Sequence, residues 1–459
     1  MKIVVLSGSP KGETSVTMQY VAYMAKNFPE HEFEIHHIAQ TIKAIEQDQK
    51  IFGRVMAAIA GADAVLWAFP LYYCLVHANY KRFIELIGER QAQAAFAGKH
   101  TALLSTSIHF YDHTAHNYIH GICDDLSMKV FGSFSAAMED LLGEMGRNRL
   151  LAFSRSFFAA ARSDASLPRH YPPVVPLEKE YLPGDCLSSV DPQGRKVILV
   201  TDAAPDDTNL RRMNDRLASC YGGQAEVLNL RDVDIKGGCL GCIQCGYDNT
   251  CVYTGRDGYI EFFDHLKSAD ILVFSGTIRD RYLSSVWKNL FDRSFYNTHI
   301  PCFSGKQLVY VISGPLCQLP NLRQILEGYT EMQGANLVGI VTDELAESPQ
   351  IDRHLEAAAC LSVEYSGAGY VKPPTYLSVG GRKIFRDEIW GRLRFPFAAD
   401  HRFYQAAGFY DFPQKDYKDR VRNLLLGLMA RVPAVRRTLF GSRMKEHMIA
   451  PFQKLLAKP

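Results

Sequence analysis

The chain opens with KIVVLSGSPKGETSVT (residues 2–17), and this stretch already indicates the fold class. Its first part, Ile3 to Leu6, is aliphatic and β-branched, which is typical of a strand buried in a parallel sheet. The Gly, Ser and Pro residues that follow predict a turn. Apolar residues then recur at helical spacing from Val16 to Met24. A strand, a short polar loop and a helix in this order form the first unit of a doubly wound α/β fold.

The chain contains this pattern twice. Lys196 to Thr201 repeats the strand of Lys2 to Ser7, 194 positions later, whereas Lys288 repeats Lys81 at a distance of 207 positions. Such internal repetition indicates two copies of one structural unit. The second copy has therefore gained 13 residues after its second strand, where Cys239 to Cys251 also span 13 positions.

The repeat predicts an α/β protein with two tandem flavodoxin-like domains and a C-terminal helical tail. Each domain is expected to be a doubly wound parallel sheet of strand order 2-1-3-4-5. The predicted segments are a first domain (residues 1–159), a Pro-rich linker (160–195), a second domain (196–370) and an aromatic, then basic C-terminal extension (371–459).

The composition is that of an ordinary globular protein. Of its 459 residues, 47% are hydrophobic and 22% are charged, with a formal net charge of +2, so nucleic acid is not an expected partner. No apolar run has the length of a membrane span. Four of the 11 cysteines crowd into one 13-residue stretch, unlike the spread pairs of a secreted disulfide framework. These features predict a cytoplasmic location.

Two loops of the first copy predict a ligand site. The loop from Ser7 to Thr17 lies between the first strand and the first helix, where backbone amides, hydroxyls and the helix N-terminus can hold a phosphate. The loop from Phe69 to Tyr73 follows the third strand and supplies aromatic rings that can cover a planar group. In this strand order the two loops are neighbours, so we expect them to bind one ligand, although a Ser/Gly/Pro loop alone is often only a turn.

These loops, together with the helix that carries Lys81, resemble the NADPH-dependent FMN reductase family over roughly residues 1 to 155. The resemblance implies that FMN phosphate contacts Ser9, Lys11, Ser15 and Thr17, and that the isoalloxazine ring lies against Pro70 to Tyr73. The residues expected to bind FMN are Ser7, Ser9, Lys11, Ser15, Thr17, Pro70, Leu71, Tyr72, Tyr73, Ser105, Thr106 and Ser107.

Four histidines follow the fourth strand of the first copy, namely His109, His113, His116 and His120. At helical spacing they fall on one face of a helix. Three interpretations stay open: a metal site, proton donors above a flavin, and ordinary packing. Of these residues, His109 and His113 are the predicted catalytic groups.

The inserted loop carries four cysteines in the pattern C-x2-C-x2-C-x5-C, at Cys239, Cys242, Cys245 and Cys251. Four thiolates in one glycine-rich loop favour an iron-sulfur cluster over zinc, which usually takes two separated ligand pairs. A cysteine loop that binds no cluster remains open. The spacing resembles that of the iron-sulfur flavoproteins, which implies a [4Fe–4S] cluster on a flavodoxin-like domain.

The second copy differs from the first at its phosphate loop. Asp202, Asp206 and Asp207 stand there, and carboxylates repel a phosphate dianion. We therefore expect FMN in the first copy and the cluster in the second.

The resulting expectation is an oxidoreductase that transfers electrons between a [4Fe–4S] cluster, fed by a ferredoxin-like donor, and FMN. One alternative is an NAD(P)H-dependent reductase of FMN, quinones or small aromatics with a structural or absent cluster. Another is a scaffold without enzymatic activity. A homodimer is expected. For the basic, amphipathic segment from Asp416 to Lys458, packing against protein is favoured over contact with an anionic membrane surface.

Overall fold

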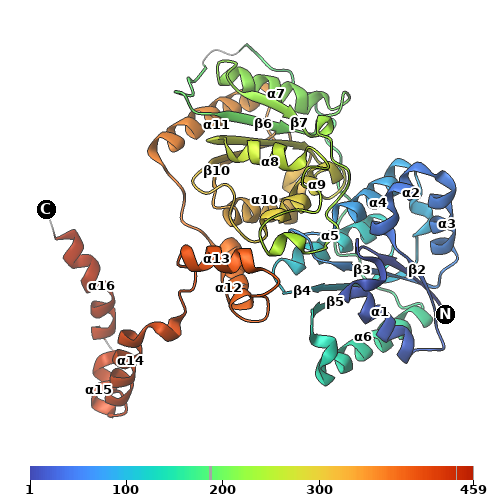
Figure 1. The fold of residues 1–459 in the computed structure, drawn as a ribbon, viewed down its shortest axis with the longest axis horizontal. Helices are drawn as coiled ribbons and strands as arrows, with labels where there is room; N and C mark the ends of the chain where they lie inside the picture. Colours follow the sequence, from blue (N-terminus) through green and yellow to red (C-terminus); the bar gives the residue numbers. More distant parts are fainter. Residues whose placement is uncertain (186–188, 441, 458–459) are drawn as a thin grey trace. The chain divides into compact units, whose positions relative to one another are not determined.

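The computed structural model describes residues 1–185, 189–440 and 442–457, and contains two parallel sheets with helices on both faces of each (Figure 1). The chain divides into two compact units, Met1–His401 and Arg402–Pro459. Both sheets belong to the first unit. We call the part around the first sheet, residues 1–162, the first lobe, and the part around the second sheet, residues 196–368, the second lobe.

The first lobe contains a five-stranded sheet in the order β2-β1-β3-β4-β5, which confirms the predicted strand order. Its strands are β1 (Lys2–Ser7), β2 (Glu32–His36), β3 (Ala64–Pro70), β4 (His100–Ser107) and β5 (Lys129–Ala137). One face packs against α1 (Val16–Asn27) and α6 (Glu144–Arg162). The other face packs against α2 (Ile38–Gln47), α3 (Gln49–Ala60), α4 (Ala78–Glu89) and α5 (Asp112–Asp125).

The core follows from the alternation of side chains along the strands. In β1, Val4 and Leu6 join the apolar cluster under α4, while Ile3 and Val5 join the cluster under α1, and all four are fully buried. Each such side chain contributes about 1.5–3 kcal/mol relative to exposure. A strand that is apolar on both faces is stable only between two layers of helices, as the sequence predicts.

The second lobe repeats this architecture. Its sheet has the order β10-β9-β8-β6-β7, which is the same topology read from the opposite edge. Its strands are β6 (Val197–Thr201), β7 (Glu226–Asn229), β8 (Ile271–Thr277), β9 (Gln307–Ser313) and β10 (Asn336–Thr342). Its helices are α7 (Thr208–Cys220), α8 (Tyr259–Lys267), α9 (Ser285–Arg293), α10 (Pro320–Met332) and α11 (Ser348–Ala368). Between α6 and β6, the described residues form neither helix nor strand.

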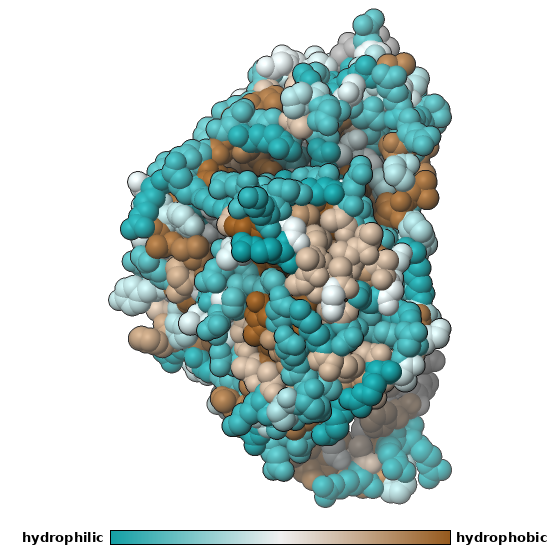
Figure 2. Space-filling model, turned by 90° about the vertical axis from the view of Figure 1, so that its right-hand side faces the viewer, coloured by the Kyte–Doolittle hydropathy of each residue, from teal (hydrophilic) through white to brown (hydrophobic). Residues whose placement is uncertain are grey.

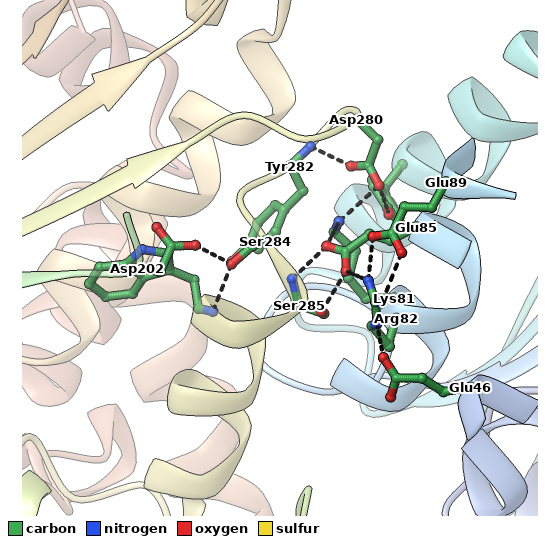
Figure 3. A network of polar contacts seen from close by, with 12 residues as sticks. Glu46, Lys81, Arg82, Glu85, Glu89, Asp202, Asp280, Tyr282, Ser284 and Ser285 are labelled. Atoms are coloured by element: carbon green, nitrogen blue, oxygen red, sulfur yellow. Dashed lines mark hydrogen bonds and ion pairs between the residues drawn. The ribbon is translucent and has the colours of Figure 1, made fainter. Parts of the chain in front are cut away.

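The two lobes pack through equivalent helices, α4 and α9, and each helix is capped by a carboxylate of the other. Figure 3 shows the cap that Glu85 provides for α9 at Ser285. Glu85 accepts the backbone N–H of Ser285 at 2.6 Å and its hydroxyl at 2.5 Å. Asp292, the repeat equivalent of Glu85, accepts the N–H of Ala78 at 2.7 Å. Ala78 and Ser285 are also equivalent positions, so the repeat produces an interface with approximate two-fold symmetry.

Buried lysines neutralise the carboxylates at this interface. Lys81 Nζ lies 2.8 Å from both Glu85 and Asp280, and Lys288 is paired with Asp292. Burial opposes the charge on Glu85, but Lys81 and the Ser285 donors outweigh it and lower the Glu85 pKa to about 2. Breaking either pair would leave an uncompensated buried charge where α4 meets α9.

Beyond the second lobe the chain is helical. The helices are α12 (Tyr376–Trp390), α13 (Ala398–Ala406), α14 (Tyr417–Met429), α15 (Pro433–Phe440) and α16 (Ser442–Leu456). Within the described part of the chain, no helix has the length and apolar character needed to span a bilayer. On the face in Figure 2, hydrophilic residues form most of the surface and apolar residues form small separate patches.

Candidate functional site

The carboxyl ends of β1, β3 and β4 lie side by side and bring the predicted cofactor residues of the first lobe together. Ser7 pairs with Ala68, and Pro70 pairs with Thr106 in the strand register. The hydroxyls of Thr17 and Thr106 are 2.6 Å apart, although 89 positions separate them in sequence. The phosphate loop and the end of β4 therefore form one polar edge.

Side chains of the phosphate loop (residues 7–17) form hydrogen bonds with backbone amides of the loop and of α1. Ser15 caps α1, since its hydroxyl accepts the N–H of Met18 at 3.2 Å. Ser9 Oγ accepts the N–H of Lys11 at 3.2 Å. Both serines and Thr17 are buried. The first amides of a helix have no carbonyl partner within it, so those of α1 are available to an anion.

Two further observations fit this loop to a phosphate. The hydroxyl of Ser7 is buried and has no hydrogen-bond partner in the structure. A Cβ at Gly8 would lie 2.9 Å from both Phe69 Cβ and Tyr80 Cδ1, so only glycine brings the backbone this close to β3. Hydroxyls, free amides and the nearby Lys11 form a donor set that suits a phosphate dianion.

The aromatic loop after β3 is a tight, strained turn. Tyr72 and Leu75 exchange backbone hydrogen bonds of 2.8 and 2.9 Å. Between them, Tyr73 and Cys74 have φ values of 36° and 63°, a left-handed conformation that residues with side chains rarely adopt. Such strain persists only where the surrounding structure enforces it, and it is often found at functional sites.

The two tyrosines of this loop face different surroundings. The Tyr72 ring packs edge-on against the His77 ring, with 4.8 Å between the ring centroids. Burial raises the pKa of Tyr72 well above its usual value. The Tyr73 ring instead packs against Phe295 and Tyr329 of the second lobe, with 6.2 Å between its ring centroid and that of each. The loop therefore contributes to the site of the first lobe and to the contact between the lobes.

The cysteine loop of the second lobe lies against the candidate site of the first. Its residue Gly241 has φ +64°, and a Cβ there would collide with the Tyr72 hydroxyl and lie 3.6 Å from Lys11 Cγ. His77 Nε2 contacts the carbonyl of Cys239 at 2.8 Å. Residues predicted to bind FMN in one lobe and the cysteine loop of the other are thus direct neighbours.

The tautomer of His77 decides which of its ring nitrogens donates a hydrogen bond to the cysteine loop. Its Nδ1 accepts the N–H of Asn79 at 3.1 Å and caps α4, so the ring proton sits on Nε2 and is donated to Cys239. Burial lowers the His77 pKa and keeps the ring neutral. Sequence reasoning missed this residue, because the only local signal is a polar residue before a helix.

The four cysteines do not form a ready ligand set. All four carry free thiols, and Cys245 Sγ lies 3.4 Å from the Phe295 carbonyl. Without a metal, burial raises the pKa of Cys239 and of Cys245 to about 12. Among the described residues, no group of three or more His, Cys, Asp or Glu side chains is placed to hold a metal ion.

The predicted common helical face of the four histidines is wrong for His109, whereas His113, His116 and His120 do lie at helical spacing in α5. Helix α5 begins at Asp112, so His109 lies before it, at a left-handed φ of 62°. There its Nδ1 lies 3.0 Å from Asp112, and its side chain is 48% exposed. The other three have unrelated neighbours: Gln324 for His113, Ser105 for His116, and the ring of His170 for His120.

His116 is the member of this set that reaches the cofactor edge. Its Nε2 lies 2.7 Å from the hydroxyl of Ser105 in β4, while its Nδ1 is buried without a partner. Burial lowers the His116 pKa to about 4, so the ring is neutral at ordinary pH. His109 and His113, the predicted catalytic residues, are exposed instead.

The equivalent loop of the second lobe is already filled by its own side chains. Asp207 accepts the backbone N–H of Ala204 at 2.8 Å and pairs with Arg279 at 2.6 Å. Asp202 is buried and bonded to Ser284 (Figure 3). A carboxylate thus takes the position of an anion in this loop, and the residues present do not fit a second phosphate.

A buried dyad beside the cysteine loop was not predicted. Asp400 is fully buried and lies 2.6 Å from His299 Nδ1, and it also accepts the Thr298 hydroxyl. Thr298 has φ 55°, which is strained for a β-branched residue. Asn249 of the cysteine loop bonds the Thr298 hydroxyl at 3.2 Å. The residues of this dyad are 101 positions apart, so no sequence motif marks it.

Residues 1–140 match the family model of NADPH-dependent FMN reductase. This part of the chain therefore carries the sequence features of an FMN-dependent oxidoreductase family. No curated protein sequence matches the chain.

Several solved structures resemble one part of the chain. An NADH:FMN oxidoreductase in its apo form is 18% identical, with 37% of this chain and 94% of that chain covered and a TM-score of 0.30. The flavoenzyme NAD(P)H:(acceptor) oxidoreductase FerB of Paracoccus denitrificans is 17% identical, with coverages of 34% and 97% and a TM-score of 0.28. General stress protein 14 of Treponema denticola, in complex with FMN, is 14% identical, with coverages of 36% and 98% and a TM-score of 0.27.

Proposed function

We propose that the chain is an FMN-dependent reductase that takes electrons from NAD(P)H and passes them to a small acceptor such as a quinone. The observation that carries this proposal is the phosphate loop of the first lobe at the N-terminus of α1, with its buried hydroxyls and its unpartnered Ser7 hydroxyl. These donors suit the phosphate of FMN, and the family match over residues 1–140 supports the same cofactor.

The residues of the first lobe have distinct roles in this proposal. Ser9, Ser15 and Thr17 hold the phosphate, and Lys11 offsets part of its charge. Tyr72 would line the ring of the cofactor, and Gly241 of the second lobe packs against the Tyr72 hydroxyl. Bound FMN supplies a centre that accepts a hydride and releases electrons singly or in pairs.

The second lobe serves as the fixed partner of the first. Its own phosphate loop is occupied by Asp207 and Arg279, so we assign one FMN to each chain. Its cysteine loop forms a wall of the neighbouring site, since His77 binds the Cys239 carbonyl. Repeating the unit within one chain allows one copy to keep the cofactor and the other to support it.

A second candidate function is electron transfer between FMN and a [4Fe–4S] cluster on Cys239, Cys242, Cys245 and Cys251. One observation favours it: the cysteine loop lies against Tyr72 and Lys11, so a cluster there would be next to the flavin. It requires the four thiolates to converge on the cluster, whereas no group of three or more His, Cys, Asp or Glu side chains among the described residues is placed to hold a metal ion. A ferredoxin-like protein is the donor in this case.

Anaerobic purification followed by assays of FMN, iron and sulfide separates these functions. The reductase contains one FMN per chain and no iron, and its flavin absorbance bleaches rapidly with NADPH. The cluster protein contains iron and sulfide, and Cys245→Ser lowers both while leaving FMN in place. Cys317→Ser is the matched control, because Cys317 is an exposed cysteine outside the loop. A colourless chain that binds no FMN contradicts both functions and leaves the scaffold alternative.

A further inference from the structure

The C-terminal unit exposes apolar side chains along whole helices. Helix α14 buries none of its residues. Besides the exposed Leu426 and Met429, five exposed apolar residues of α14 recur at helical spacing, at Tyr417, Val421, Leu424, Leu425 and Leu428. This spacing places them on one face of the helix.

Helix α16 repeats the pattern. Its exposed apolar residues are Met444, Met448, Ile449, Phe452, Leu455 and Leu456. Isolated helices of this length are only marginally stable in water, and most helices gain stability from burial of an apolar face. We call the apolar faces of α14 and α16 the apolar stripes. Their exposure in the C-terminal unit points to a partner surface that covers them.

The charge of this unit indicates what that surface is. Residues 402–459 contain 12 of the 51 Lys and Arg but only 4 of the 49 Asp and Glu, a net charge of +8. Residues 1–401 consequently carry −6. Two copies of this unit, each with a net charge of +8, would repel each other. An anionic surface would attract the unit.

We propose that the C-terminal unit docks on an anionic lipid surface. Helices α14 and α16 lie in the plane of the interface, with the apolar stripes among the acyl chains and basic residues such as Arg422, Arg436 and Arg437 at the headgroups. Each basic residue near such a surface strengthens binding by about fivefold. The proposal does not depend on the function of the two lobes.

Vesicle flotation of the full-length chain tests this proposal. Phosphatidylcholine vesicles that contain about 30% phosphatidylglycerol are expected to carry the protein upward at about 50 mM NaCl, with at least roughly tenfold weaker binding at about 500 mM. Pure phosphatidylcholine vesicles should leave it at the bottom. Leu424→Glu with Leu428→Glu should reduce binding by about tenfold or more, because both substitutions place charge in an apolar stripe.

The control is Leu345→Glu, since Leu345 is 77% exposed in the first unit and outside the stripes. It should bind vesicles like the unchanged chain. The proposal is overturned if the chain ignores anionic vesicles, or if the Leu424/Leu428 and Leu345 variants bind equally. It is also overturned if light scattering shows self-association that only the stripe variant abolishes, because the occupant is then a second copy of this chain.

Discussion

Gly241→Ala examines the contact between the cysteine loop and the candidate FMN site. At φ +64° an alanine costs about 1 to 2 kcal/mol, because its Cβ approaches the next carbonyl. The same Cβ collides with the Tyr72 hydroxyl, and overpacking of this kind typically costs about 1 to 3 kcal/mol more. We therefore expect a total loss of about 2 to 5 kcal/mol in the free energy of unfolding.

Gly255→Ala is the matched control for this substitution. Gly255 lies in the same segment at φ +69°, but nothing lies within 4 Å of its added Cβ. It should lose only the backbone contribution of about 1 to 2 kcal/mol. Urea unfolding gives both free energies, and fluorescence titration gives FMN affinity. Only Gly241→Ala should weaken FMN binding, because it displaces Tyr72; equal effects of the two substitutions on stability and affinity would refute the proposed contact.

Three further predictions concern the first lobe and the interface between lobes. Asp292→Asn leaves Lys288 as an unpaired buried charge and should lower the free energy of unfolding in urea by about 3–5 kcal/mol. The control is Glu13→Gln, at a side chain that is 87% exposed, which should change this free energy by less than about 0.5 kcal/mol. His116 has its pKa lowered to about 4 by burial, so the unfolded chain binds the extra proton as pH falls from about 6.5 to 4. Stability should therefore fall by up to about 3 kcal/mol over this window, and His116→Gln should remove that slope. Thr17→Val should weaken FMN binding by about tenfold or more in fluorescence titration, while Asp207→Asn should leave the number of FMN sites unchanged.

The fold was largely predictable because its signals are local and repeated. Strands such as Ile3 to Leu6 are apolar on both faces, which requires helices above and below. Because the second copy repeats the first in sequence, the same topology could be predicted for the second lobe. The phosphate loop was predictable for the same reason, since the turn residues, the cap Ser15 and the helix follow each other directly in sequence.

The contacts that assemble the site could not be predicted in this way. His77 binds a backbone carbonyl 162 positions away, and a carbonyl belongs to every residue type. Glu85 and Asp292 cap helices of opposite lobes, so neither stands near its own cap in sequence. His109 was assigned to a helix that begins only at Asp112, because helical spacing does not reveal a left-handed residue before the first turn.

We propose that one chain binds one FMN, in the first lobe. Calorimetric titration of the FMN-free, full-length chain with FMN measures the number of sites directly. We expect one site per chain, lost or strongly weakened when Ser9→Ala and Thr17→Val are combined and unchanged by Asp207→Asn. Two sites per chain, no site, or a single site that survives the Ser9/Thr17 variant would show that the first lobe is not the one FMN site.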